Sequence, residues 1–195
     1  MTVATSVVRI PACLVLAFFA EQVLWAWTGD ARAAAQAAPV LRLYAIGNGF
    51  LALAAFPYYL QFAKGDLKLH LIGNVIFVLL LVPLLVWATW KYGAMGAGYA
   101  WLGSGIAYFL TWVPLVHRRF AKGLHHQWLL RDVSQIVAMG VLAASLLHAL
   151  LPWPQGRVGV LTVALLAGVA VLIFSAAGSD QVRNIVFPHR RAAAI

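Results

Sequence analysis

The stretch LIGNVIFVLLLVPLLVWATW at residues 71–90 decides the fold class of this chain. It carries no charged residue, and it is as long as the roughly 20 apolar residues that a helix needs to cross a bilayer. Its apolar residues run continuously, without the alternation that a strand of a membrane barrel shows. The stretch therefore predicts a transmembrane helix, and with it an integral membrane protein of the all-α class.

Other parts of the chain have the same character, which predicts a polytopic helical bundle of about six transmembrane helices. The predicted spans cover residues 7–27, 40–62, 67–90, 96–116, 133–151 and 158–177. Short segments rich in Gly, Asp, Lys and Pro separate these runs, as turns do. We assign residues 1–182 to the transmembrane domain and residues 183–195 to a basic cytoplasmic tail.

The composition agrees with a lipid environment. Hydrophobic residues make up 64% of the 195-residue chain and charged residues only 10%, whereas soluble domains are about a quarter charged. The formal net charge of +9 could suggest a nucleic-acid ligand. The cationic residues lie between the apolar runs, however, as they do in membrane proteins. We therefore expect no nucleic-acid partner.

The distribution of Lys and Arg predicts the orientation of the chain in the membrane. Ten of the 14 fall on one side of the predicted spans: Arg9, Lys64, Lys68, Arg118, Arg119, Lys122, Arg131, Arg183, Arg190 and Arg191. The other four are Arg32, Arg42, Lys91 and Arg157. Because cytoplasmic loops are the richer in Lys and Arg, both termini are expected in the cytoplasm, with the chain in the plasma (inner) membrane.

The first predicted span, 7–27, has two interpretations. Arg9 followed by an apolar run and by Ala31-Arg32-Ala33 resembles a cleaved signal peptide. Glu21 and two tryptophans, however, stand between the apolar run and that cleavage-like site. We therefore favour a helix that is retained.

The loop at 117–132 also has two interpretations. Phe120, Leu124 and Trp128 are spaced by four residues among several cationic residues. This spacing is typical of a short amphipathic helix that lies on the inner leaflet. The alternative is a solvated basic loop.

Nothing in the sequence has the pattern of a catalytic site, so we expect no enzyme, no metal and no cofactor. His117, His125 and His126 could be imagined as metal ligands, but a polar cytosolic loop is the better interpretation. The single cysteine, Cys13, excludes an internal disulfide and any metal site of paired cysteines.

Polar residues inside the predicted spans are the best candidates for a substrate cavity. Glu21 is the one acidic residue within a span, and a charge there normally faces the protein interior or a wet cavity. Arg42 begins the second span on the same side and could pair with Glu21. The alternative is a purely structural ion pair. Asn48 and Asn74 are further cavity candidates, although such residues more often bond neighbouring helices.

Glycine and proline patterns suggest closely packed, kinked helices. Pairs of small residues four apart, which let helices approach, occur at Gly103/Ala107, Gly140/Ala144 and Ala164/Gly168. Pro57, Pro83 and Pro114 lie inside predicted spans and are expected to kink them. Such helices are common in transporters that rock between two states, and they also occur in static bundles.

The order of several segments resembles a known family. These segments are LWAWTGD at 24–30, AAPVLRL at 37–43, FPYYLQFAKG at 56–65, Asn74, VPL at 82–84 and YGAMGAGYAWL at 92–102. Residues 11–131 thereby resemble the C-terminal half of bacterial polysaccharide (O-antigen type) flippases, in the multidrug/oligosaccharidyl-lipid/polysaccharide exporter superfamily. The last two spans match only in hydropathy.

The resemblance implies a fold and a function. Such proteins have two helical lobes around a central cavity and move lipid-linked oligosaccharides to the outer leaflet during polysaccharide and lipopolysaccharide assembly. This chain has about half of their spans and would correspond to a truncated frame, a split gene product or a half-length relative. We therefore expect membrane lipids and a lipid-linked oligosaccharide as ligands, and a partner half or a second copy of the chain as protein partner.

The leading hypothesis is a flippase-like transport component that works by alternating access. Glu21 and Arg42 would contribute to its cavity. The alternative is a non-transporting subunit or scaffold of a polysaccharide-assembly complex.

Overall fold

The chain is a bundle of helices, and the computed structural model describes residues 2–121 and 123–178. No strand occurs in that part of the chain, which confirms the all-α prediction. The predicted tail at 183–195 lies outside the described residues. The elements are α1 (Thr2–Phe18), α2 (Ala20–Thr28), α3 (Ala31–Leu53), α4 (Ala55–Ala63), α5 (Lys68–Phe120), α6 (Leu124–Gln127), the π-helix η1 (Trp128–Val133), α7 (Ser134–Leu150) and α8 (Arg157–Ala177).

Several of these helices are long and apolar enough to cross a membrane. By length and composition, the described residues hold four such helices, or five if the bent pair α1 and α2 forms one span. The structure is therefore that of a helical membrane protein. The predicted count of six is not confirmed by this criterion, because two predicted spans, 67–90 and 96–116, both lie within α5.

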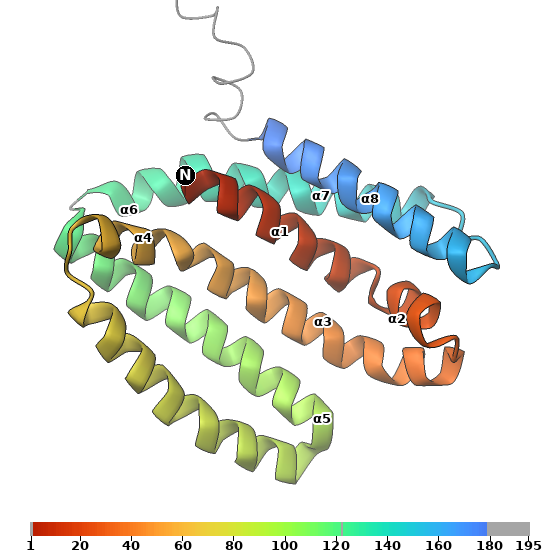
Figure 1. The fold of residues 1–195 in the computed structure, drawn as a ribbon, viewed down its shortest axis with the longest axis horizontal. Coiled ribbons are helices and arrows are strands. Elements are labelled where there is room, and N and C mark those ends of the chain that lie inside the picture. The colour runs from red at the N-terminus through yellow and green to blue at the C-terminus, as the bar shows by residue number, and fades with distance from the viewer. Residues whose placement is uncertain (1, 122, 179–195) are drawn as a thin grey trace, which may run out of the picture.

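The 53-residue helix α5 is in fact a hairpin. Gly93 interrupts it with the non-helical angles φ 63° and ψ −150°. Figure 1 shows the first limb (68–92) and the second limb (94–120) side by side. Asp66, just before α5, forms an ion pair of 3.2 Å with Arg119 at its far end. A straight helix of this length would separate its ends by roughly 80 Å, so the chain must reverse at Gly93.

The first predicted span is broken rather than continuous. Helices α1 and α2 meet at an angle of 79° around Phe19. The Phe19 side chain is fully buried, with ring contacts to His148 at 5.6 Å and to Trp153 at 5.4 Å. No glycine or proline stands at the break. The bend coincides instead with the packing of Phe19 against the end of α7 and the turn that follows α7.

The C-terminal end of α2 is capped from a distant part of the chain. The Arg157 side chain donates hydrogen bonds to the carbonyl oxygens of Ala26 at 3.0 Å and Trp27 at 2.7 Å. The last carbonyls of a helix lack partners within the helix and attract cations. Arg157 thus fixes α2 against the start of α8.

Replacing Arg157 tests this cap. Because hydrogen bonds from a charged group are worth about 1.5–3 kcal/mol and this site is exposed, we expect Arg157→Ala to lower the free energy of unfolding by about 1–2 kcal/mol. Thermal unfolding in detergent measures the change. Arg32→Ala, which removes the same charge from an exposed position at the start of α3, is the control. Equal losses in the two variants would contradict the cap.

Glycines let α3 and the second limb of α5 approach closely. A Cβ added to Gly105 would lie 2.9 Å from the carbonyl oxygen of Gly47, and one added to Gly98 would lie 2.9 Å from Leu43. Tyr44 of α3 stacks on Trp101 of α5 with ring centroids 5.7 Å apart. These contacts make α3 and the second limb one tightly packed unit.

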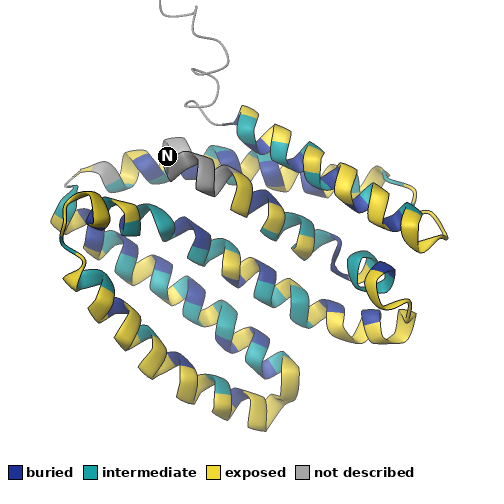
Figure 2. Ribbon diagram, in the orientation of Figure 1, coloured by how far each residue is buried: buried dark blue, intermediate teal, exposed yellow. Residues whose placement is uncertain are grey.

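Figure 2 shows that exposed residues dominate the first limb of α5. Its exposed side chains include Leu71, Leu79, Leu80 and Val86, each about two-thirds exposed. In a membrane, lipid chains cover such a surface, so its apolar character fits the predicted span.

The 117–132 segment differs from both sequence interpretations. Residues 117–120 end α5, and residues 124–132 belong to α6 and η1, but Trp128 is buried in the bundle. Trp128 is 6% exposed and stacks on Phe56 with ring centroids 5.5 Å apart. Trp128 packs in the same buried core cluster as Phe109 and Val113, so tertiary contacts determine its position.

Candidate functional site

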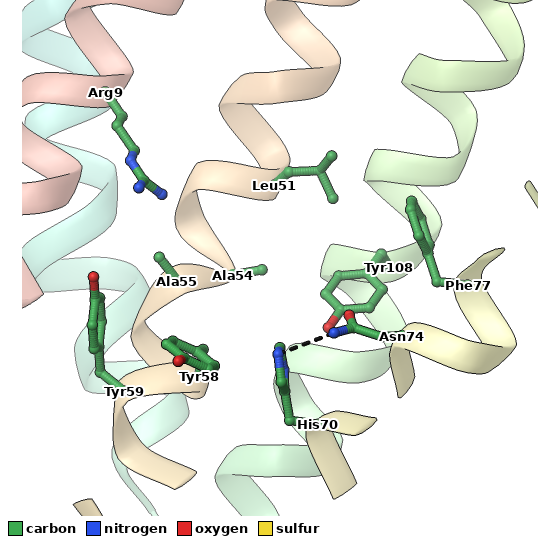
Figure 3. A pocket seen from close by; sticks show the side chains of 10 residues that line it. All are labelled: Arg9, Leu51, Ala54, Ala55, Tyr58, Tyr59, His70, Asn74, Phe77 and Tyr108. Atoms are coloured by element: carbon green, nitrogen blue, oxygen red, sulfur yellow. Dashed lines mark hydrogen bonds between the residues drawn. The ribbon is translucent and has the colours of Figure 1, made fainter. Parts of the chain in front are cut away.

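A partly polar cavity of about 360 Å³ lies near the end of the bundle where α4 turns into α5. It is bounded by α1, by the junction of α3 and α4, and by both limbs of α5 (Figure 3). Its lining residues are Arg9, Leu51, Ala54, Ala55, Tyr58, Tyr59, His70, Asn74, Phe77 and Tyr108.

A break between α3 and α4 shapes one wall of the cavity. Ala54 separates the two helices, and Pro57 follows in the first turn of α4. Because proline has no backbone N–H and crowds the carbonyl four residues earlier, it disrupts the helix at Leu53. The small side chains of Ala54 and Ala55 leave space there, and the next turn brings Tyr58 and Tyr59 to the cavity. Pro83 and Pro114, in contrast, lie within limbs of α5 that stay helical.

The polar groups opposite α1 are held in place by one another. The Asn74 amide and His70 Nε2 form a hydrogen bond of 3.0 Å, one turn apart on the first limb of α5. The Tyr58 ring packs on the His70 ring with centroids 4.6 Å apart, which joins α4 to α5. Tyr108 of the second limb packs against Phe77 of the first at 5.2 Å. The wall therefore presents a fixed set of hydroxyl, amide and imidazole groups.

Among the described residues, Arg9 is the one cation that lines the cavity, and none of those that line it is a carboxylate. Figure 3 shows Arg9 and Tyr59 on one side, with His70, Asn74 and Tyr108 on the other. A guanidinium binds carboxylate and phosphate groups through several N–H donors. Tyrosine and asparagine donate and accept hydrogen bonds, as hydroxyl-rich ligands require. The arrangement can thus bind an anion that carries polar groups, and the described lining residues include no Ser, Thr, Cys or Lys side chain beside a base.

The structure places one of the four predicted cavity residues at this site. Asn74 lines the cavity, whereas Glu21, Arg42 and Asn48 do not. Glu21 is exposed in the first turn of α2, and Arg42 and Asn48 are exposed on α3. Within the described residues, no ion pair joins Glu21 to Arg42.

Sequence reasoning did not assign Arg9, Tyr58, Tyr59 or Tyr108 to the cavity. In the sequence, Arg9 marks the predicted cytoplasmic side, and Tyr58 and Tyr59 belong to the FPYYLQFAKG segment that carries the family resemblance. The signal that could have identified the site is the combination of a cation at the start of an apolar run with paired tyrosines beside Pro57.

His117 at the end of α5 and His125 of α6 form a hydrogen-bonded pair. His117 Nδ1 and His125 Nδ1 are 2.9 Å apart, which fits a neutral donor and a neutral acceptor. His117 is 1% exposed and lies against Phe56 and Trp128. The described residues contain no group of three His, Cys, Asp or Glu side chains that could hold a metal ion.

Comparisons with known protein families, with curated proteins and with solved structures found no match to this chain. The functional assignment therefore rests on the residues and geometry of the cavity.

Proposed function

We propose that this chain is a flippase-like membrane component that moves a lipid-linked oligosaccharide towards the outer leaflet. The observation that carries the proposal is the cavity around Arg9, with its three tyrosines, His70 and Asn74. A lipid-linked sugar combines an anionic phosphate with hydroxyl groups, and both find matching partners in such a lining. The work is binding and reorientation, without covalent chemistry.

The proposal includes six spans with both termini in the cytoplasm. Each limb of α5 has about 25 residues and is therefore about 37 Å long, enough to cross a bilayer alone. Helices α1 and α2 together form one bent span, and α3 and α4 together form another. The two limbs of α5 and the helices α7 and α8 are the other four. The Arg9 cavity then opens near the cytoplasmic side, where a substrate made in the cytoplasm would enter.

Cysteine labelling tests this topology. In a Cys13→Ser background, we expect Lys91→Cys, beside the turn of α5, to react with an impermeant maleimide in right-side-out spheroplasts. Lys64→Cys, after α4, should react only once the membrane is permeabilised. Reaction of both positions from the same side would contradict the separation of the two turns by a membrane.

A complementation experiment tests the function. The parent chain is expected to restore surface polysaccharide in a bacterial strain that lacks its flippase. Arg9→Ala should reduce the restored polysaccharide at least tenfold, because the cavity then lacks its cation. Arg32→Ala, which removes an exposed cation outside the cavity, should match the parent. Absence of restoration by the parent, both alone and together with a partner half, would refute the transport claim.

A further inference from the structure

A second cavity, an apolar groove of about 340 Å³, lies along α1 between α3 and α7. One end is formed by Ile10 of α1, Leu53 of α3 and Val137 of α7. The other end is formed by Phe18 of α1, Ile46 of α3 and Val141 of α7.

The groove runs parallel to the helices that line it. The lining of α1 extends from Ile10 to Phe18, about eight residues, so the groove is roughly 12 Å long at 1.5 Å per residue. Ile10 and Leu53 are 4% and 7% exposed and close one end. Ile46 and Val141 are 42% and 37% exposed, so the other end is open at its rim. In a membrane, the hydrocarbon chains of the lipids run in the same direction as these helices and therefore as the groove.

Its size and lining limit what can fill it. Water needs two to four polar partners in a cavity, and the lining side chains are apolar apart from Cys13. A transmembrane helix about 30 Å long would extend well beyond a groove of roughly 12 Å, whereas a hydrocarbon segment can lie within it. An apolar cavity of about 150 Å³ already holds a benzene molecule, so the groove has room for a longer hydrocarbon segment.

We propose that this groove binds one hydrocarbon chain of a bilayer phospholipid and retains that lipid through purification. The bound chain supplies the dispersion contacts that the walls of an empty groove would lack. It thereby joins α1 to α3 and α7 at the level where α1 approaches its bend. The inference depends on the membrane setting of the helices and is independent of the proposed transport.

Filling the groove tests the proposal. Ala17 lines the groove, whereas its neighbour Leu16 is exposed and does not. Protein purified from phospholipid membranes in a mild detergent is washed, and native mass spectrometry counts the phospholipids retained. We expect one phospholipid on the parent and on Leu16→Trp, and at least a tenfold lower occupancy on Ala17→Trp. Val141→Phe, at the rim, replaces Ala17→Trp if size exclusion shows that Ala17→Trp does not fold.

Cys13, the single cysteine of the chain, provides a second readout because it lines the same groove. Its reaction with N-ethylmaleimide should be at least tenfold slower in the lipid-replete protein than after exhaustive delipidation. Equal reaction rates, equal lipid retention by the two tryptophan variants, or a parent without retained lipid would overturn the proposal. If Cys13 is protected only when the protein forms dimers, a second copy of the chain covers the groove, and the proposal of a bound lipid is overturned. Neither lipid retention nor the reaction rate of Cys13 depends on transport, so both test this inference separately from the proposed function.

Discussion

The substitution Gly105→Val is expected to destabilise the bundle by roughly 3 kcal/mol, at the upper end of the usual cost of overpacking. A Cβ at position 105 would lie 2.9 Å from the carbonyl oxygen of Gly47. That oxygen belongs to the backbone of α3 and cannot rotate away as a side chain would. Helix α3 must therefore move from the second limb of α5, which also separates the stacked rings of Tyr44 and Trp101. Thermal unfolding followed by tryptophan fluorescence measures the loss.

Gly103→Val is the matched control for this prediction. Gly103 lies two residues earlier in the same helix, and no atom lies within 4 Å of the Cβ that a substitution would add. Both variants change helix propensity equally, so their difference isolates the contact with Gly47. Similar unfolding temperatures for the two variants would contradict the close approach of α3 and α5.

Gly93→Ala is expected to cost about 1–3 kcal/mol, because residues with side chains rarely adopt the conformation at this position. At φ 63° and ψ −150°, Gly93 reverses the chain between the two limbs of α5. A residue with a Cβ strains this turn and favours a different path of the backbone. We expect a lower unfolding temperature and a smaller monodisperse fraction on size exclusion.

Gly156→Ala separates this strain from a general effect of losing a glycine in a turn. Gly156 precedes α8 with φ −92° and ψ 140°, a conformation open to all residues. No atom lies within 4 Å of an added Cβ. Its loss should cost only a few tenths of a kcal/mol to about 1 kcal/mol, as for other N-cap positions. A larger cost for Gly156→Ala than for Gly93→Ala would argue against a strained turn in α5.

Local sequence signals predicted the helices well where each helix is determined by its own residues. The apolar runs at 67–90 and 96–116 correspond to the two limbs of α5, and the short segment between them contains Gly93. Hydropathy and turn residues suffice here, because lipid is the main partner of the first limb.

Features that depend on tertiary contacts could not be predicted from local patterns. No glycine or proline lies at the break at Phe19, so the local sequence does not indicate it. The break coincides with contacts of Phe19 to His148 and Trp153, which are distant in sequence. Among the small-residue pairs, a Cβ added to Gly140 would lie close to Ser175, whereas one added to Gly103 would have no atom within 4 Å. The spacing of small residues shows that helices can approach, without showing which face is used.

The cavity was only partly predictable for the same reason. Asn74 was identified because a polar residue inside a span is unusual. Arg9 and Tyr108 are about a hundred residues apart, and only the packing of α1 beside the α5 hairpin brings them to one cavity. Glu21 and Arg42 were paired by their predicted depth in the membrane, but depth does not determine which side of a helix carries a residue.

Transbilayer movement in proteoliposomes tests the central claim most directly. The purified chain is reconstituted, and the movement of a fluorescent lipid-linked oligosaccharide between leaflets is followed with an impermeant quencher. We predict faster movement with the parent and with Arg32→Ala than in protein-free liposomes, and at least a tenfold lower rate with Arg9→Ala. Movement with the parent, both alone and together with a partner half, that is no faster than in protein-free liposomes would contradict the proposed function.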